Sequence, residues 1–159
     1  MSVMLTRLSA TNINLLPLAF GSIPYNKRAS LFQQYAVEQE QGLREVFTTI
    51  LDGKVIAYGT LVWLSPYEPF LKQLIPEIKD LNVVVAYRRQ GYATQLIRHF
   101  ELMVQARGYS VIGIGVGVTP DYNAARSLYL SLGYVFDGAG IIPDEWGGAE
   151  YLTKKITSF

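Results

Sequence analysis

The pattern of hydrophobic and polar positions predicts a chain in which strands and helices alternate. Strands are expected at Val3–Leu8, Glu45–Leu51, Val55–Leu64, Ile78–Ala86, Ser110–Val118, Tyr134–Asp137 and Glu150–Ile156. Helices are expected from Thr11 or Asn12 to Leu16, where Pro17 interrupts the segment, and then at Tyr25–Gln39, Tyr92–Arg107 and Pro120–Leu132. Asp52-Gly53 separates two of the strands and is typical of a hairpin turn. This order predicts an α/β fold with one mixed sheet.

The predicted strand Ser110–Val118 has two unlike faces. Its isoleucines and valines fall on one side, and Gly113, Gly115 and Gly117 fall on the other, because strand side chains alternate. A face made of glycines weakens a strand and indicates that something approaches its backbone closely. A packed structural element and a bound ligand explain this pattern equally well.

The segment Ser65–Pro76 is expected to be a long loop with about one helical turn. It contains three prolines, with Tyr67, Phe70 and Leu71 between them. Such a loop either covers the sheet or forms a lid beside a substrate, and loops that carry aromatic residues often do both.

Composition excludes several classes of function. The 159 residues fit a single domain, 1–159, and half of them are hydrophobic, as in compact globular proteins. A formal net charge of +1 argues against a general nucleic-acid binder. The absence of cysteine excludes disulfides, thiolate metal sites and cysteine nucleophiles, and a single histidine, His99, leaves no histidine cluster for a metal. His99 is assigned to the surface of its helix.

The N-terminal sequence lacks the features of a signal peptide, and no apolar run approaches the length of a membrane span. The expectation is therefore a soluble cytoplasmic protein without a membrane partner.

The segment Leu81–Leu96 carries the clearest functional signal. A short apolar run, Val83–Val85, is followed by paired arginines, then by Gly91 and the start of a helix. A glycine turn at a helix start exposes backbone N–H groups at the positive end of the helix dipole. Together with nearby arginines, these groups form a site for phosphate oxygens.

Arg88-Arg89-Gln90-Gly91-Tyr92-Ala93 resembles the R/Q-x-x-G-x-G/A signature of the GNAT-type acyl-CoA N-acyltransferases. With Asn123 taken as the asparagine of the family's second cofactor motif, the segment Asn123–Tyr134 resembles N-x-x-A/S-x-x-L-Y-x-x-x-G-F/Y. Either motif alone is weak, but each lies on the expected element, and the resemblance extends from Val3 to Ile156. It implies a GNAT-like fold: a sheet of about seven strands with helices on both faces and a splayed central strand pair.

The resemblance implies that the cofactor is acetyl-CoA and assigns residues to it. The pyrophosphate would lie over the turn, and the pantetheine arm would pair with the backbone of the preceding strand and contact Asn123. The implied cofactor-binding residues are Val83, Val84, Val85, Arg88, Arg89, Gln90, Gly91, Tyr92, Ala93, Thr94, Asn123 and Arg126. Arg88 either adds charge there or braces the turn.

The resemblance also implies catalytic groups. Tyr129 would act as a general acid that protonates the departing thiolate; a core tyrosine is the structural alternative. An alkylammonium must lose a proton before it can attack, so a carboxylate base is needed, and Glu77 and Asp80 are the candidates, with Glu68 as a third. Surface charges flanking a strand explain these carboxylates equally well.

The function expected is N-acetyl transfer to an amine by direct attack on the thioester. A non-catalytic acyl-CoA sensor with the same fold is the alternative. A dinucleotide-binding module is disfavoured, because Gly113–Gly117 lies within a strand and has the wrong glycine spacing. The acceptor, a small molecule or a peptide, is left open, as is a homodimer; Tyr25, Tyr67, Phe70, Trp146, Glu68, Asp144 and Glu145 would line its site in this family.

Overall fold

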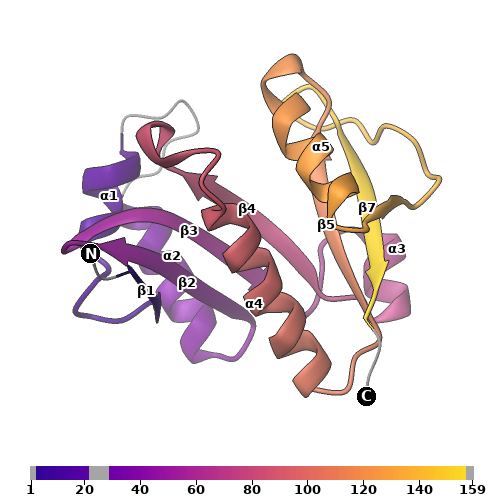
Figure 1. The fold of residues 1–159 in the computed structure, drawn as a ribbon. Helices are drawn as coiled ribbons and strands as arrows, with labels where there is room; N and C mark the ends of the chain where they lie inside the picture. The colour runs from indigo at the N-terminus through magenta and orange to yellow at the C-terminus, as the bar shows by residue number, and fades with distance from the viewer. Residues whose placement is uncertain (1–2, 22–28, 157–159) are drawn as a thin grey trace. The chain divides into compact units, whose positions relative to one another are not determined.

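The computed structural model describes residues 3–21 and 29–156 (Figure 1). The strands are β1 (Val3–Arg7), β2 (Arg44–Leu51), β3 (Lys54–Val62), β4 (Glu77–Val83), β5 (Val111–Gly117), β6 (Val135–Phe136) and β7 (Ala149–Lys155). The helices are α1 (Leu15–Phe20), α2 (Ala29–Glu40), α3 (Glu68–Gln73), α4 (Tyr92–Ala106) and α5 (Asn123–Ser131), with 3₁₀ turns at Val85–Tyr87 and Pro120–Tyr122. The seven strands form one mixed sheet in the order β1-β2-β3-β4-β5-β7-β6. The expected α/β fold is confirmed.

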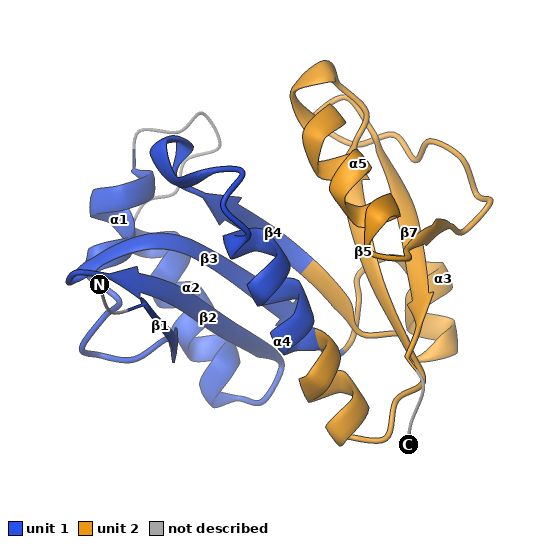
Figure 2. Ribbon diagram, viewed as in Figure 1, with its two compact units in different colours: residues 1–63, 79–100 blue, residues 64–78, 101–159 orange. Residues whose placement is uncertain are grey.

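The chain divides into two compact units (Figure 2). The first comprises Met1–Trp63 and Lys79–Phe100, and the second comprises Leu64–Ile78 and Glu101–Phe159. The boundary therefore falls within β4 and within α4.

The first unit has helices on both faces of its strands. β1, β2 and β3 pair antiparallel, and Asp52-Gly53 forms the expected hairpin turn with both residues at positive φ. Side chains of α1 and α2 pack with Tyr58 of β3 in one apolar core. The next residue, Gly59, faces the opposite side, where a side chain would collide with Leu81 and with Phe100 of α4. This explains why a glycine interrupts an otherwise bulky strand.

The second unit shows what approaches the glycine face of β5. A Cβ atom at Gly113 would overlap the ring of Phe70, and one at Gly117 would overlap the ring of Tyr122. At Gly115 it would lie 3.0 Å from Tyr151. Aromatic side chains from α3, from the turn before α5 and from β7 therefore cover the glycines. Of the two explanations for the pattern, close packing accounts for these contacts.

Three differences from the predicted boundaries have a clear physical reason. Pro17 lies in the first turn of α1 instead of ending a helix, because the first turn needs no N–H group from that residue. β4 ends at Val83 because a 3₁₀ turn begins at Val85, and the helix expected from Pro120 begins as another 3₁₀ turn. The predicted helix Tyr25–Gln39 corresponds to α2, and its first residues, including Tyr25, lie outside the described part of the chain.

Among the described helices, none is both long and apolar enough to cross a membrane.

Candidate functional site

The turn between β4 and α4 has the backbone geometry expected of an anion site. Arg89 has a φ of 63° and Gly91 a φ of 89°, so two residues just before α4 have positive φ. Apart from Gly91 and its chain neighbours, no atom of the described residues lies within 4 Å of the place where a Cβ of Gly91 would be. The first N–H groups of a helix have no intrahelical acceptor, so those at the start of α4 point out of the helix beside this open glycine.

Arg88 braces this turn. Its Nε donates a hydrogen bond to the carbonyl of Val83 at 3.0 Å, which ties the guanidinium back to the end of β4. Of the two roles expected for Arg88, the structural one is therefore present, and the planar guanidinium still contributes positive charge beside the turn.

The backbone of the three valines is not equally available to a ligand. The N–H of Val84 donates to the carbonyl of Ile56, and its carbonyl accepts from Tyr87, so Val84 faces β3 and the 3₁₀ turn. Neighbouring residues of a strand point their backbone groups in opposite directions, so Val83 faces away from β3. The backbone groups of Val84 are thus engaged within the protein, and the carbonyl of Val83 accepts from Arg88.

Glu77 lies at the start of β4 in a buried environment. It is 2% exposed, and its Oε1 accepts a hydrogen bond from Ser65 Oγ at 2.5 Å. Ser65 Oγ in turn accepts from the N–H of Tyr67 at 2.9 Å. The Oε2 of Glu77 lies 3.6 Å from where a Cβ of Gly115 would be, so the carboxylate lies beside the glycine face of β5.

Asp80 has different surroundings. The phenols of Tyr35 and Tyr58 both donate to its Oδ2 at 2.7 Å, and Asn82 Nδ2 donates to its Oδ1 at 2.8 Å. Burial, followed by the negative charge of Asp80, raises the pKa of both tyrosines above the ordinary value. The phenols therefore stay protonated and act as hydrogen-bond donors at neutral pH.

Tyr129 is buried on α5 and is 6% exposed. Burial raises the pKa of its phenol to about 12. A thiol has a pKa of about 8.5, so full proton transfer from Tyr129 to a thiolate is uphill. A neutral phenol can nevertheless donate a hydrogen bond to a developing thiolate throughout the physiological range.

The other end of the second motif needs a correction. Counted back from Leu128-Tyr129, the family pattern places its asparagine at residue 122, which is Tyr122 here, and Asn123 lies one position later. Asn123 is exposed, and its Oδ1 accepts from Arg126 Nη1 at 3.0 Å. Arg126 Nη2 also donates to the carbonyl of Gly117 at 2.7 Å. The guanidinium of Arg126 thus connects α5 to the end of β5.

The segment Ser65–Pro76, for which covering the sheet and forming a lid were both expected, packs on its own unit. Tyr67 and Phe70 are buried, the ring of Tyr67 stacks on Tyr151 at 3.7 Å between centroids, and Tyr67 Oη donates to Asp137 Oδ2 at 2.7 Å. Glu68 forms an exposed ion pair with Lys72 of the same helix. The covering role is therefore present, and Glu68 has the surroundings of a solvated surface charge.

His99 is only partly on the surface, in contrast to the expectation. Its ring lies 4.2 Å from that of Phe47 of β2, and its buried Nε2 has no hydrogen-bond partner among the described residues. Burial lowers its pKa. Sequence reasoning also missed the Ser65–Glu77 pair and the tyrosines on Asp80, because no local pattern connects these residues.

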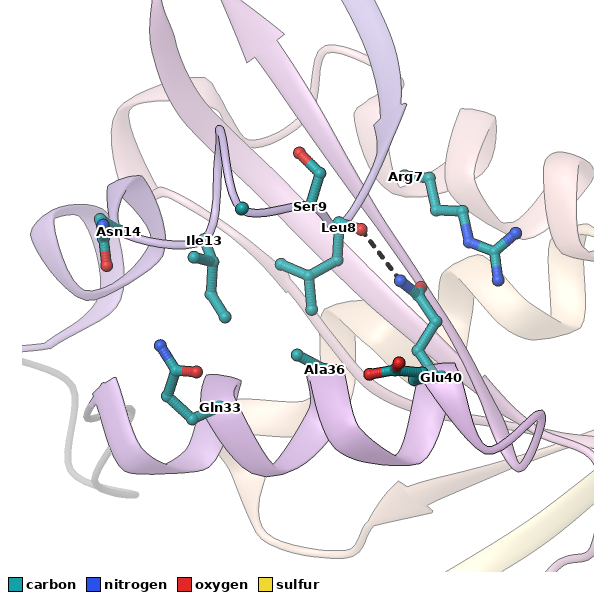
Figure 3. A pocket seen from close by; sticks show the side chains of 10 residues that line it. Arg7, Leu8, Ser9, Ile13, Asn14, Gln33, Ala36 and Glu40 are labelled. Carbon is teal, nitrogen blue, oxygen red and sulfur yellow. Dashed lines mark hydrogen bonds between the residues drawn. The ribbon is translucent and has the colours of Figure 1, made fainter.

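A hollow of about 600 Å³ lies elsewhere in the first unit, between residues 7–14 and α2 (Figure 3). The amide of Gln39 in its wall donates to the carbonyl of Leu8 and accepts from the N–H of Val46. This side chain therefore joins α2 to the strands, and the hollow adds no group to the site described above.

The turn at Arg88–Thr94 fits a phosphate group, since it combines an open glycine, a helix start and arginine side chains. Comparison with known proteins agrees with this interpretation: the model of the acetyltransferase (GNAT) family matches residues 13–134. The chain belongs to the GNAT acetyltransferase family.

Individual GNAT proteins are similar to this chain to different extents. One curated relative is described as an uncharacterized N-acetyltransferase, YsnE, from Bacillus subtilis (strain 168). It is 28% identical to this chain over 80 residues. The match spans 50% of this chain and about half, 53%, of the relative. An N-acetyltransferase structure from Staphylococcus aureus Mu50 superposes with a TM-score of 0.78 at 16% identity, over 99% of this chain and 100% of that one. A GNAT acetyltransferase from Elizabethkingia anophelis, solved with acetyl-CoA bound, gives 0.62 at 18% identity, over 96% and 97% of the two chains. At these identities the structures show the shared fold.

Proposed function

We propose that this chain is an acetyl-CoA-dependent N-acetyltransferase that transfers an acetyl group to a primary amine by direct attack on the thioester. The observation that carries the proposal is the turn before α4, where Arg89 and Gly91 are left-handed and a Cβ of Gly91 would meet open space. Family membership and the acetyl-CoA bound to one structural neighbour support the same cosubstrate.

The chain's residues take the following roles in binding. The N–H groups around Gly91 and at the start of α4 donate to pyrophosphate oxygens, and Thr94 on the first helical turn adds a hydroxyl. Arg88 and Arg89 add positive charge. The backbone of Val83 pairs with the pantetheine amides, as an added strand would.

The chemistry requires one proton transfer, from the amine, and stabilisation of the departing thiolate. The amine nitrogen forms a bond to the acetyl carbon, the carbon–sulfur bond breaks, and the sulfur leaves as a thiolate. Glu77 takes the proton lost by the attacking amine, directly or through a water. Tyr129 stabilises the thiolate by donating a hydrogen bond from its buried phenol. The chain has no cysteine, so the proposal needs no acyl-cysteine intermediate.

The proposal is tested by calorimetry with acetyl-CoA, using two glycines of matched geometry. Gly91 and Gly108 have φ values of 89° and 87°. At both positions, a Cβ atom would have no described atom within 4 Å apart from the glycine itself and its chain neighbours. Gly91→Ala should weaken acetyl-CoA binding by about tenfold or more, because it disturbs the phosphate turn. Gly108→Ala carries the same backbone strain at the other end of α4 and should leave binding unchanged.

Absence of heat with the folded wild-type protein would refute the proposal. A panel of primary amines, each assayed for release of free CoA, separates an enzyme from a sensor. Amine-dependent release supports transfer, whereas tight binding without release for every amine would favour the sensor.

A further inference from the structure

β4 changes direction at Asp80. Among the described residues other than glycine, those with a positive φ are Asp52, Leu74, Asp80 and Arg89, and Asp80, at 58°, is the one that lies inside a strand. Aspartate tolerates the left-handed region better than most residues, but the conformation is still strained. Such strain persists where the surroundings impose it.

The side chain of Asp80 is held from three directions. Tyr35 on α2 and Tyr58 on β3 donate to one carboxylate oxygen, and Asn82 donates to the other. Tyr58 is fully buried and Tyr35 is 7% exposed. We call this set, Tyr35, Tyr58, Asp80 and Asn82, the tyrosine brace.

The backbone next to Asp80 is held as well. Thr60 Oγ1 donates to the carbonyl of Lys79 at 2.5 Å and accepts from Arg44 Nη1 at 2.8 Å. Arg44 also pairs with Glu38 of α2 at 2.6 Å, and its guanidinium lies 4.3 Å from the centre of the Tyr35 ring. Hydrogen bonds thus connect two parts of this segment to α2. The carbonyl of Lys79 is connected through Thr60 and Arg44, and the side chain of Asp80 is connected through Tyr35.

The pairing of β4 with β5 ends just before the kink. β4 pairs with β5 in parallel at Glu77–Gly113 and Ile78–Ile114, and the ladder stops there although β4 continues to Val83. A left-handed residue in a strand redirects the backbone groups that follow it, as β-bulges near active sites do. The groups redirected here include those of Val83, to which the proposed function assigns pantetheine.

We propose that the tyrosine brace is a positioning device: it holds β4 in the kinked path that presents its backbone to pantetheine, and Asp80 acts by position and not as the proton acceptor. The inference rests on the proposed function. The oxygens of Asp80 face two phenols and an amide that hold the carboxylate in place, whereas Glu77 lies beside the glycine face of β5. Of the two carboxylates of β4 that sequence reasoning left open, this leaves Glu77 for the role of base in the proposed function.

Acetyl-CoA affinity, measured by calorimetry on the full chain, separates the two roles without an acceptor amine. Asp80→Ala should raise the Kd by about tenfold, because it removes the partner of both phenols and adds strain at a positive φ. Asp80→Asn should stay within about threefold of the wild type, since asparagine tolerates this φ and its amide oxygen still accepts from the phenols. Tyr35→Phe, which deletes a single hydroxyl, should raise the Kd by roughly threefold.

Asp52→Ala is the matched control. Asp52 has a φ of 51° in the exposed hairpin turn of the same unit, so its substitution adds the same strain away from the brace. Its Kd should equal that of the wild type, and circular dichroism verifies that each variant is folded.

An unchanged Kd for folded Asp80→Ala and Tyr35→Phe would overturn the inference while leaving the proposed function intact. The inference also fails if Asp80→Asn binds normally but loses about 100-fold of its turnover, as expected of a general base. A wild-type protein that does not bind acetyl-CoA refutes the proposed function itself.

Discussion

Glu77 and Asp80 lie three residues apart on β4, yet the chain surrounds them differently. Glu77 is almost completely buried, receives a hydrogen bond from Ser65 and lies beside the glycine face of β5. Asp80 is partly exposed and receives hydrogen bonds from two tyrosines and an asparagine. Two carboxylates on one strand therefore have different surroundings, which is the basis for proposing different roles for them.

The backbone at Asp80 also departs from that of a regular strand. Side chains alternate along a regular strand, and residues 77 and 80 would point to opposite faces by that rule alone. The left-handed conformation of Asp80 interrupts the alternation and places its carboxylate against α2 and β3. The surroundings of each carboxylate, more than its residue type, suggest its role.

The largest expected effect is on turnover at Glu77. Glu77→Gln keeps the shape of the side chain but removes the proton acceptor, so kcat should fall by about 100-fold to 10,000-fold. The Kd for acetyl-CoA should not change, because Glu77 has no role in cofactor binding. Steady-state release of CoA, with an amine that supports turnover, measures the first quantity, and calorimetry measures the second.

Glu68→Gln is the control for Glu77→Gln. Glu68 is an exposed carboxylate of the same unit, paired with Lys72, and its substitution should leave kcat within twofold or so. If kcat falls by the same small amount in Glu77→Gln and Glu68→Gln, Glu77 is not the base. Its proposed role would then no longer differ from that of Asp80.

The sequence predicted the local secondary structure around the candidate site well. The strand, the glycine turn and the helix at residues 81–96 are contiguous, so the turn could be recognised from neighbouring residues alone. Tyr129 could likewise be located, because it follows directly from the spacing to Gly133.

Long-range contacts could not be predicted in the same way. Tyr35 lies 45 positions before Asp80, and no local pattern connects them. The same holds for His99, whose contact with Phe47 depends on how α4 packs on β2, and for Phe70, which fills the space left by Gly113. The glycine face of β5 indicated a close approach but not the identity of the approaching group.

A smaller effect is expected on stability at Ser65. Ser65→Ala removes the hydroxyl that donates to buried Glu77 and accepts from the N–H of Tyr67. Because the lost hydrogen bond involves a buried carboxylate, the free energy of unfolding should fall by about 1.5–3 kcal/mol. Urea denaturation followed by circular dichroism measures it.

Ser131→Ala provides the comparison for Ser65→Ala. The hydroxyl of Ser131 donates to the carbonyl of Leu128 on the exposed face of α5, so its loss should cost about 0.5 kcal/mol or less. If the two serine variants have the same free energy of unfolding, the hydroxyl of Ser65 contributes little to stabilising the buried carboxylate of Glu77. The surroundings of Glu77 and Asp80 would then differ less in energy than the geometry indicates.

The smallest expected effect is on the pH dependence of stability, through a tyrosine that donates to Asp80. Burial and the charge of Asp80 raise the pKa of Tyr35, so above pH ~10 the unfolded chain loses a proton that the folded chain keeps. The stabilisation is complete below pH ~10 and declines above it, by about 1.4 kcal/mol per pH unit for each such tyrosine.

Tyr35→Phe has no phenol to ionise, so its stability should start lower at neutral pH and decline less steeply. The urea unfolding curves of the two proteins should therefore converge as the pH rises from 9 to 11 or so. If the stabilities of the two proteins instead change in parallel with pH, Tyr35 ionises as readily in the folded protein as in the unfolded chain. That result is incompatible with a buried phenol that is hydrogen-bonded to a carboxylate.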